Sequence, residues 1–151
     1  MKKIIFIICM CMCLCSCQKD DTDNKKPQQT QEVVDENALL RRNVADFCSN
    51  VELFNSMLSI LIANSMEQKE SDFGAEEVIS HLDKAREICD NDIANSKADT
   101  VYINDIKQES YNIVESCDIL LELLDDSDLS DTLERQKEIE DLCEKLKGYL
   151  D

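Results

Sequence analysis

Apolar residues recur along most of the chain at intervals of three and four, the spacing of one face of an α-helix. The longest such seam alternates intervals of four and three over Leu40, Val44, Phe47, Val51, Phe54, Leu58 and Leu61. A second apolar stripe on the same segment, made of Leu53, Met57 and Ile60, predicts that this helix contacts two neighbours. We therefore expect a long helix from about residue 36 that ends at the polar segment 71–74.

Three shorter seams follow, separated by polar breaks. Glu76 and Glu77 suit the first turn of the second helix, where the helix dipole is positive. Ser96 or Asp99 is expected to cap the third helix, and segment 125–130 separates the third helix from the fourth. The seams consist of Val78, Leu82, Ala85 and Cys89; of Ile103, Ile106, Ile113, Cys117, Leu120 and Leu124; and of Leu133, Ile139, Cys143, Leu146 and Leu150.

The breaks between these segments are short, so sequential helices should pack antiparallel. Two glycines, one proline and few aromatic residues also favour helices over sheets. The pattern predicts an all-α domain over residues 36–151, an up-down four-helix bundle.

The N-terminus has a different pattern. Lys2 and Lys3 precede an apolar run over residues 4–14, which is too short to span a bilayer. The run leads into Leu14-Cys15-Ser16-Cys17, a sequence that resembles the lipobox of bacterial lipoproteins. The resemblance implies that residues 1–16 are a signal peptide and that the Cys17 thiol is lipidated, which anchors the protein to a membrane.

The residues after this cysteine are polar. Gln18, Lys19, Asp20 and Asp21 resemble the export signal of surface lipoproteins in the Bacteroidota, where a lysine and two acids follow the lipidated cysteine. The resemblance implies an outer-membrane lipoprotein that faces the cell exterior, with the periplasmic face as the alternative. Residues 17–35 hold too little apolar surface to fold, which predicts a disordered tether.

The charge of the chain bears on its partners. The formal net charge is -17, and removal of Lys2 and Lys3 with the signal peptide leaves 14 basic and 33 acidic side chains, or -19. Such a surface repels nucleic acid and attracts a basic protein. We therefore expect no nucleic-acid partner.

The acids are concentrated in one stretch. No basic residue lies between Lys107 and Arg135, although like charges on one helix face are destabilising. Beside the acids, Ile119 and Leu123 lie off the apolar seam, which predicts an apolar centre with a charged rim. The hypothesis is a docking surface for a basic protein, formed by Glu115, Asp118, Glu122, Asp125, Asp126, Asp128 and Asp131.

Candidate chemistry is sparse. His81 is the single histidine, so no histidine-based triad or paired di-metal motif can be assembled. Four cysteines, at positions 48, 89, 117 and 143, remain in the helical domain. The rise per residue of a helix gives the expected height of each cysteine along the bundle axis. Even the nearest pairs, Cys89 with Cys143 and Cys117 with Cys143, differ too much in height to form a disulfide. We expect buried thiols rather than two disulfides, with no metal site, cofactor or catalytic residue.

These observations favour a non-catalytic protein-binding module on a lipid anchor. One concrete form is an immunity protein that neutralises a basic toxin at the envelope. The alternative is a structural or accessory subunit of an envelope or secretion complex. An enzyme is the class that the sequence favours least.

Overall fold

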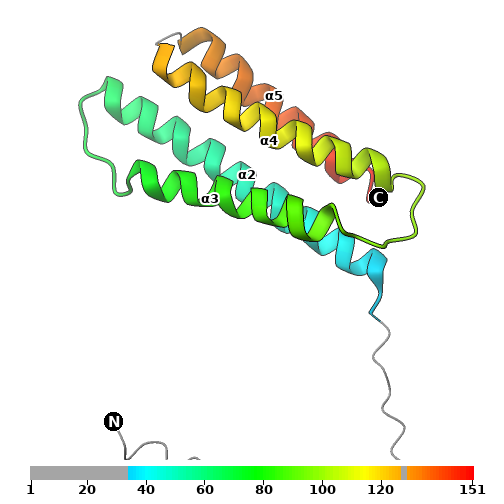
Figure 1. Ribbon diagram of the computed structural model, residues 1–151. Coiled ribbons are helices and arrows are strands. Elements are labelled where there is room, and N and C mark those ends of the chain that lie inside the picture. Colours follow the sequence, from blue (N-terminus) through cyan, green and yellow to red (C-terminus); the bar gives the residue numbers. More distant parts are fainter. Residues whose placement is uncertain (1–33, 127–128) are drawn as a thin grey trace, which may run out of the picture. The chain divides into compact units, whose positions relative to one another are not determined.

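The computed structural model describes residues 34–126 and 129–151, and this part of the chain is all-α. Four helices pack against one another and run in alternating directions (Figure 1). The predicted up-down four-helix bundle is therefore confirmed. The helices are α2 (Glu36–Met66), α3 (Ala75–Glu87), α4 (Ile103–Asp126) and α5 (Leu129–Gly148), and a π-helical segment η1 (Ile88–Ile93) continues α3.

Several predictions fall on other residues. The signal peptide, the tether up to residue 33, and the lipidation and export residues Cys17, Gln18, Lys19, Asp20 and Asp21 lie outside the described residues, as does Asp128.

Helix α2 begins where the sequence supplies a cap. Asp35 has an extended backbone, and its carboxylate accepts hydrogen bonds from the backbone N–H groups of Asn37 and Ala38, both at 3.1 Å. This side chain satisfies two of the N–H groups that a helix start leaves without partners. The folded domain therefore has a defined first turn at Glu36.

The predicted seams form the core. Six of the seven seam residues of α2 are buried, and the seventh, Leu61, packs partly against them. The seam of α3 and η1 and most of the seam of α4 are buried too. In α5 the prediction for Leu133 is wrong, because this residue is 57% exposed while Thr132 and Gln136 are buried in its place. Counting back from Ile139 by three and four gives Gln136 and Thr132, so a polar residue occupies each core position.

The two neighbours of α2 are α3, together with its continuation η1, and α5. The expectation that this helix contacts two neighbours is confirmed. Of the stripe that predicted it, Met57 packs against the core, whereas Leu53 and Ile60 are 44% and 47% exposed. The contact with α5 instead involves the polar residues Asn55 and Ser59, which bond to α5. Hydrophobic spacing does not reveal such a contact.

The start of α4 also differs from expectation. The helix begins at Ile103, so neither Ser96 nor Asp99 caps it. The Ser96 hydroxyl instead accepts a hydrogen bond from the Ala98 N–H at 3.2 Å, inside the connection between η1 and α4. The Thr100 hydroxyl accepts from the Tyr102 N–H at 3.3 Å, directly before the helix. The polar side chains of this connection thus bond to backbone N–H groups that precede the helix, and the helix itself begins later than predicted.

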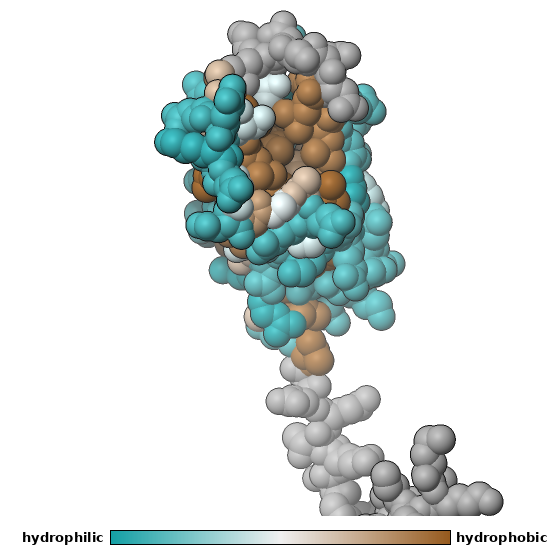
Figure 2. All heavy atoms as spheres, turned by 90° about the vertical axis from the view of Figure 1, so that its left-hand side faces the viewer, coloured by the Kyte–Doolittle hydropathy of each residue, from teal (hydrophilic) through white to brown (hydrophobic). Residues whose placement is uncertain are grey.

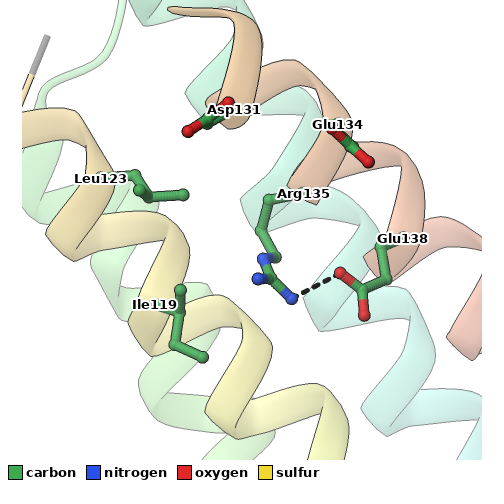
Figure 3. Close-up of a pocket in the computed structure, with 6 residues that line it drawn as sticks. All are labelled: Ile119, Leu123, Asp131, Glu134, Arg135 and Glu138. Carbon is green, nitrogen blue, oxygen red and sulfur yellow. Dashed lines mark hydrogen bonds and ion pairs between the residues drawn. The ribbon is translucent and has the colours of Figure 1, made fainter. Parts of the chain in front are cut away.

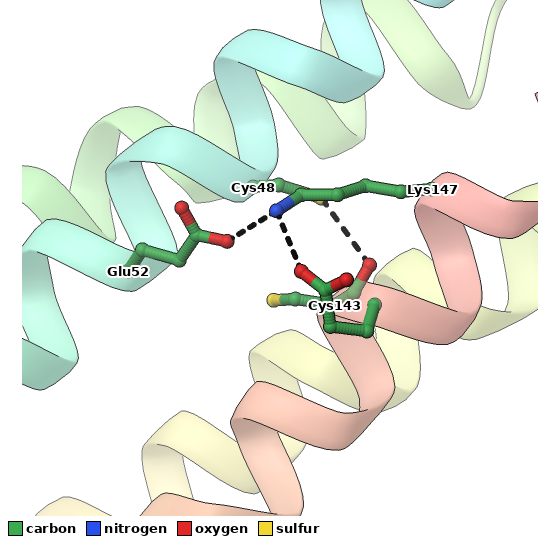
Figure 4. Close-up of polar contacts among 5 residues, drawn as sticks. Cys48, Glu52, Cys143 and Lys147 are labelled. Atoms are coloured by element: carbon green, nitrogen blue, oxygen red, sulfur yellow. Dashed lines mark hydrogen bonds and ion pairs between the residues drawn. The ribbon is translucent and has the colours of Figure 1, made fainter.

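The four cysteines of the domain are all buried and free. Cys48 and Cys143 lie together, because the Cys48 thiol points to the Cys143 carbonyl oxygen at 4.0 Å (Figure 4). From the expected heights along the bundle axis, Cys89 and Cys117 were predicted to lie nearest to Cys143. The proximity of Cys48 to Cys143 was therefore not predicted. Burial raises the pKa of the Cys89 thiol to about 11 and that of the Cys117 thiol to about 12. The Cys89 and Cys117 thiols therefore stay protonated in the folded protein near neutral pH.

Candidate protein-binding site

The acids predicted to form a docking surface do not all share one face. Glu115 and Glu122 on α4 are exposed. Asp118 turns toward α3, where it forms an ion pair with Arg86. Asp125 and Asp126 end α4, whereas Asp131 belongs to α5.

Arg86 is the residue that joins α3 to α4. Its guanidinium bonds to Asp118 across the interface and to Asp83 one turn earlier on α3, at 2.7 Å. Burial alone would lower the pKa of Arg86, but the hydrogen bonds and charges of Asp118 and Asp83 outweigh it and raise this pKa. One acid of the predicted docking surface is therefore engaged within the bundle.

A groove lies between α4 and α5. Ile119 and Leu123 of α4 line one wall (Figure 3). The opposite wall comes from α5 and consists of Asp131, Glu134, Arg135 and Glu138. The groove encloses about 320 Å³, within the range of ligand-binding clefts.

The charge of this groove is negative. Three carboxylates and one guanidinium line it; Arg135 forms an ion pair with Glu138, and Asp131 and Glu134 are exposed. The prediction that Ile119 and Leu123 lie off the core seam is confirmed, because both are partly exposed and line the groove. The rim residues Glu134 and Glu138 were not predicted, since the turn of α5 that faces α4 depends on how α5 is rotated about its axis.

A second apolar surface lies at the end of the bundle that carries the α2–α3 connection. Figure 2 shows apolar side chains gathered in a hollow there, between hydrophilic surfaces. The partly buried apolar residues at the helix ends concerned are Leu61, Ile62, Phe73, Leu121 and Leu124. This end of the bundle therefore leaves part of the core open to solvent.

The junction of α2 and α5 is charged. Lys147 of α5 donates to Glu52 of α2 at 2.5 Å and to Glu144 of its own helix at 3.0 Å (Figure 4). Hydrogen bonds with Glu52 and then Glu144 raise the pKa of Lys147. Beside this cluster, a cavity of about 390 Å³ is lined by Glu52, Asn55, Ser56, Glu140 and Glu144.

Neither His81 nor any metal-binding group adds a reactive site in the described part of the chain. The Nδ1 atom of His81 lies 3.2 Å from the Asn50 amide oxygen, which ties α3 to α2. Within residues 34–126 and 129–151, no three histidine, cysteine or acidic side chains are grouped to hold a metal ion. None of the helices in the same ranges combines the length and apolar character that crossing a bilayer requires.

Comparison of the chain with protein-family models, with curated proteins and with solved structures finds no match.

Proposed function

We propose that this protein is a membrane-anchored lipoprotein that binds a basic protein partner and catalyses no reaction. The observation that supports the proposal best is the groove between α4 and α5, in which Ile119 and Leu123 lie opposite Asp131 and Glu134. Apolar surface at the centre and charge at the rim is the layout of many transient interfaces. A net charge of -17 favours encounter with a basic partner.

The concrete form we propose is an immunity protein that neutralises a basic toxin at the cell envelope. The alternative partner is another subunit of an envelope or secretion complex, for which this protein would be an accessory. Either role needs binding without catalysis. Electrostatic attraction should act mainly on the association rate, so binding should weaken as salt is added.

We further propose that lipidated Cys17 anchors the protein in the outer membrane and that Lys19, Asp20 and Asp21 direct it to the cell exterior. The support is the sequence resemblance alone. Protease added to intact cells should remove the domain if it faces outward. Protection that ends only when the cells are lysed would place the domain on the periplasmic face.

The partner can be tested by cross-linking in native membranes, followed by purification of the full-length protein at low salt. We expect one dominant basic protein with the wild type and its loss with Asp131→Lys/Glu134→Lys. The pair Asp118→Lys/Glu122→Lys tests the α4 acids in the same way. The control is Glu87→Lys/Asp92→Lys, which makes the same charge change at two exposed positions on α3 and η1.

Three outcomes decide among the surfaces. Loss with the α5 pair alone supports the groove, and loss with the α4 pair alone supports the originally predicted acidic face. Equal capture by all variants and by the wild type would contradict the proposed function. A captured toxin would support the immunity role, whereas capture of a resident envelope complex would favour the accessory role.

A further inference from the structure

Cys48 of α2 and Cys143 of α5 are two cysteines that the fold brings together. The Cys48 thiol donates toward the Cys143 carbonyl oxygen at 4.0 Å, and a hydrogen bond joins the Cys143 thiol to the Cys48 sulfur. The two residues are 0% and 1% exposed. The pair therefore lies inside the contact between α2 and α5, where the hairpin of α2 and α3 meets the hairpin of α4 and α5.

The two thiols differ in acidity. The hydrogen bond from Cys143 lowers the pKa of Cys48 and outweighs burial, which would raise it, and the positive charge of Lys147 lowers it further. The negative charges of Glu52 and Glu144 oppose this lowering to a smaller extent. The same hydrogen bond, together with burial, raises the pKa of Cys143. Cys48 is therefore the thiol that ionises first, and the thiolate is the nucleophilic form of cysteine.

An ion-pair bridge lies beside the two thiols. The Lys147 ammonium bonds to Glu52 of α2 and to Glu144 of α5, and the Lys147 side chain passes next to Cys48 (Figure 4). The side chains of Lys147, Glu52 and Glu144 are 39%, 45% and 74% exposed, so this bridge costs little to open. Glu52 and Glu144 also line the cavity of about 390 Å³ between α2 and α5. Opening of the bridge should therefore admit a water-sized molecule from this cavity to the thiols.

We propose that Cys48 and Cys143 are a modification site, at which a small hydroperoxide converts the two thiols to an intramolecular disulfide. Hydrogen peroxide is the simplest oxidant of this class. It is close to water in size, whereas the burial of both sulfurs excludes bulkier disulfide reagents. The bond joins residues 95 positions apart and ties the two hairpins together. This inference goes beyond the proposed function and requires no partner protein.

The oxidation balances in two steps. The Cys48 thiolate attacks one peroxide oxygen and the O–O bond breaks. Cys48 becomes a sulfenic acid, and the other oxygen leaves as hydroxide, which takes up the proton that Cys48 released. The Cys143 sulfur then attacks the Cys48 sulfur, the S–O bond breaks, and the second oxygen leaves as water with the Cys143 proton. Each sulfur loses one electron and the peroxide gains two.

Peptide mapping of the wild-type protein tests the proposal. The purified full-length protein in detergent is reduced, freed of reductant, treated with hydrogen peroxide, alkylated and digested with trypsin. The four cysteines of the domain fall in separate tryptic peptides, and the N-terminal cysteines share another, residues 4–19. The domain peptides are residues 43–69, 87–97, 108–135 and 138–145. We expect mass spectrometry to find 43–69 linked to 138–145, and dithiothreitol to reverse the link.

Matched variants show which thiols are needed. Cys48→Ala and Cys143→Ala should each lose the link, whereas Cys89→Ala should retain it. Cys117→Ala is the critical control, because the charge of Cys117 also acts on Cys143, and it should retain the link too. In Cys143→Ala the sulfenic acid on Cys48 has no neighbouring thiol with which to condense, so dimedone should label Cys48. The decisive map is that of the wild type, so it does not depend on the folding of any variant.

The same protein unfolded in urea is the reference for selectivity. Its thiols are all accessible, so peroxide should give a mixture of links. Two results would overturn the inference. One is native protein whose four domain thiols are all still alkylated under conditions that oxidise the unfolded protein. The other is a native map in which Cys117 replaces Cys48 as the partner of Cys143, or one that repeats the mixture of the unfolded protein.

Discussion

Asn55 on α2 and Gln136 on α5 each bond through the side chain to the main chain of the other. The Asn55 amide nitrogen donates to the Gln136 carbonyl oxygen at 3.1 Å, and the Gln136 amide nitrogen donates to the Asn55 carbonyl oxygen at 3.3 Å. Gln136 also donates to the Ser59 hydroxyl at 2.8 Å. Because both residues are buried, this exchange fixes the register of the two helices.

Apolar substitution of this pair should reveal its coupling. Gln136→Met keeps the shape of the side chain but removes two hydrogen bonds, so we expect the free energy of unfolding to fall by about 1–3 kcal/mol. The double variant Asn55→Leu/Gln136→Met should cost less than the two single variants together. Urea denaturation of all four proteins measures this difference, and strictly additive costs would mean that the two residues act independently.

The ion pair between Arg86 and Asp118 predicts opposite effects for two neighbouring acids. Asp118→Asn breaks the contact between α3 and α4, and we expect it to lower stability by less than about 1 kcal/mol because the pair is partly exposed. Glu122→Gln relieves repulsion from Asp118 one turn earlier and should raise stability by a few tenths of a kcal/mol. Thermal melts at low and high salt check both, since salt should shrink each difference. The same sign for both would contradict the prediction.

Burial of the thiols predicts a loss of stability in alkali. An unfolded thiol ionises near pH 9, whereas Cys89 and Cys117 have pKa values of about 11 and about 12 when folded. Unfolding therefore releases protons above pH 9. The contribution of each thiol is complete below pH 9 and declines as the pH rises toward the folded pKa, by about 1.4 kcal/mol at pH 10.

Urea denaturation at pH 8, 9 and 10 in the presence of a reductant measures this decline. The Cys89→Ala and Cys117→Ala variants serve as controls because each lacks one of the titrating groups. They should be less stable than the wild type at pH 8, owing to lost packing, but should lose less stability by pH 10. Parallel curves for wild type and variants would show that these thiols do not control the alkaline response.

The lipobox resemblance predicts a single lipidation site. Cys17→Ala should abolish labelling by radioactive palmitate and leave the uncleaved precursor, because the thiol is the group that receives the lipid. Cys15→Ala, two residues earlier, should retain labelling and serves as the control. The N-terminal peptide of the mature protein, identified by mass spectrometry, should begin at Cys17, and any other start would contradict the assignment.

The seam residues of α2 show why most of the fold could be predicted. From Leu40 to Leu58 their spacing keeps one face apolar over many turns, and no other face of the segment offers comparable surface to bury. The contact between α2 and α5 could not be found in that way. Its central residues, Asn55 and Gln136, are polar, and each becomes favourable in the core only when the other is present.

The candidate site was predictable to a lesser degree. The position of Ile119 and Leu123 off the seam of α4 follows from helical periodicity within one segment. The acids that face them belong to α5, and their placement depends on the rotation of that helix. The sequence analysis assigned Leu133 to the core face of α5 because it is apolar. The residues that occupy this face are the polar Thr132 and Gln136, so the predicted rotation of the helix was wrong.

The pairing of helices that are consecutive in the chain has a consequence for folding kinetics. Helix α2 packs most closely against α3, and α4 against α5, so each hairpin can form before the two meet. Bundles with such local contacts fold within microseconds to milliseconds. Cys48, Cys89, Cys117 and Cys143 are all covered once the hairpins join, so a newly made chain would expose its thiols to oxidants only briefly.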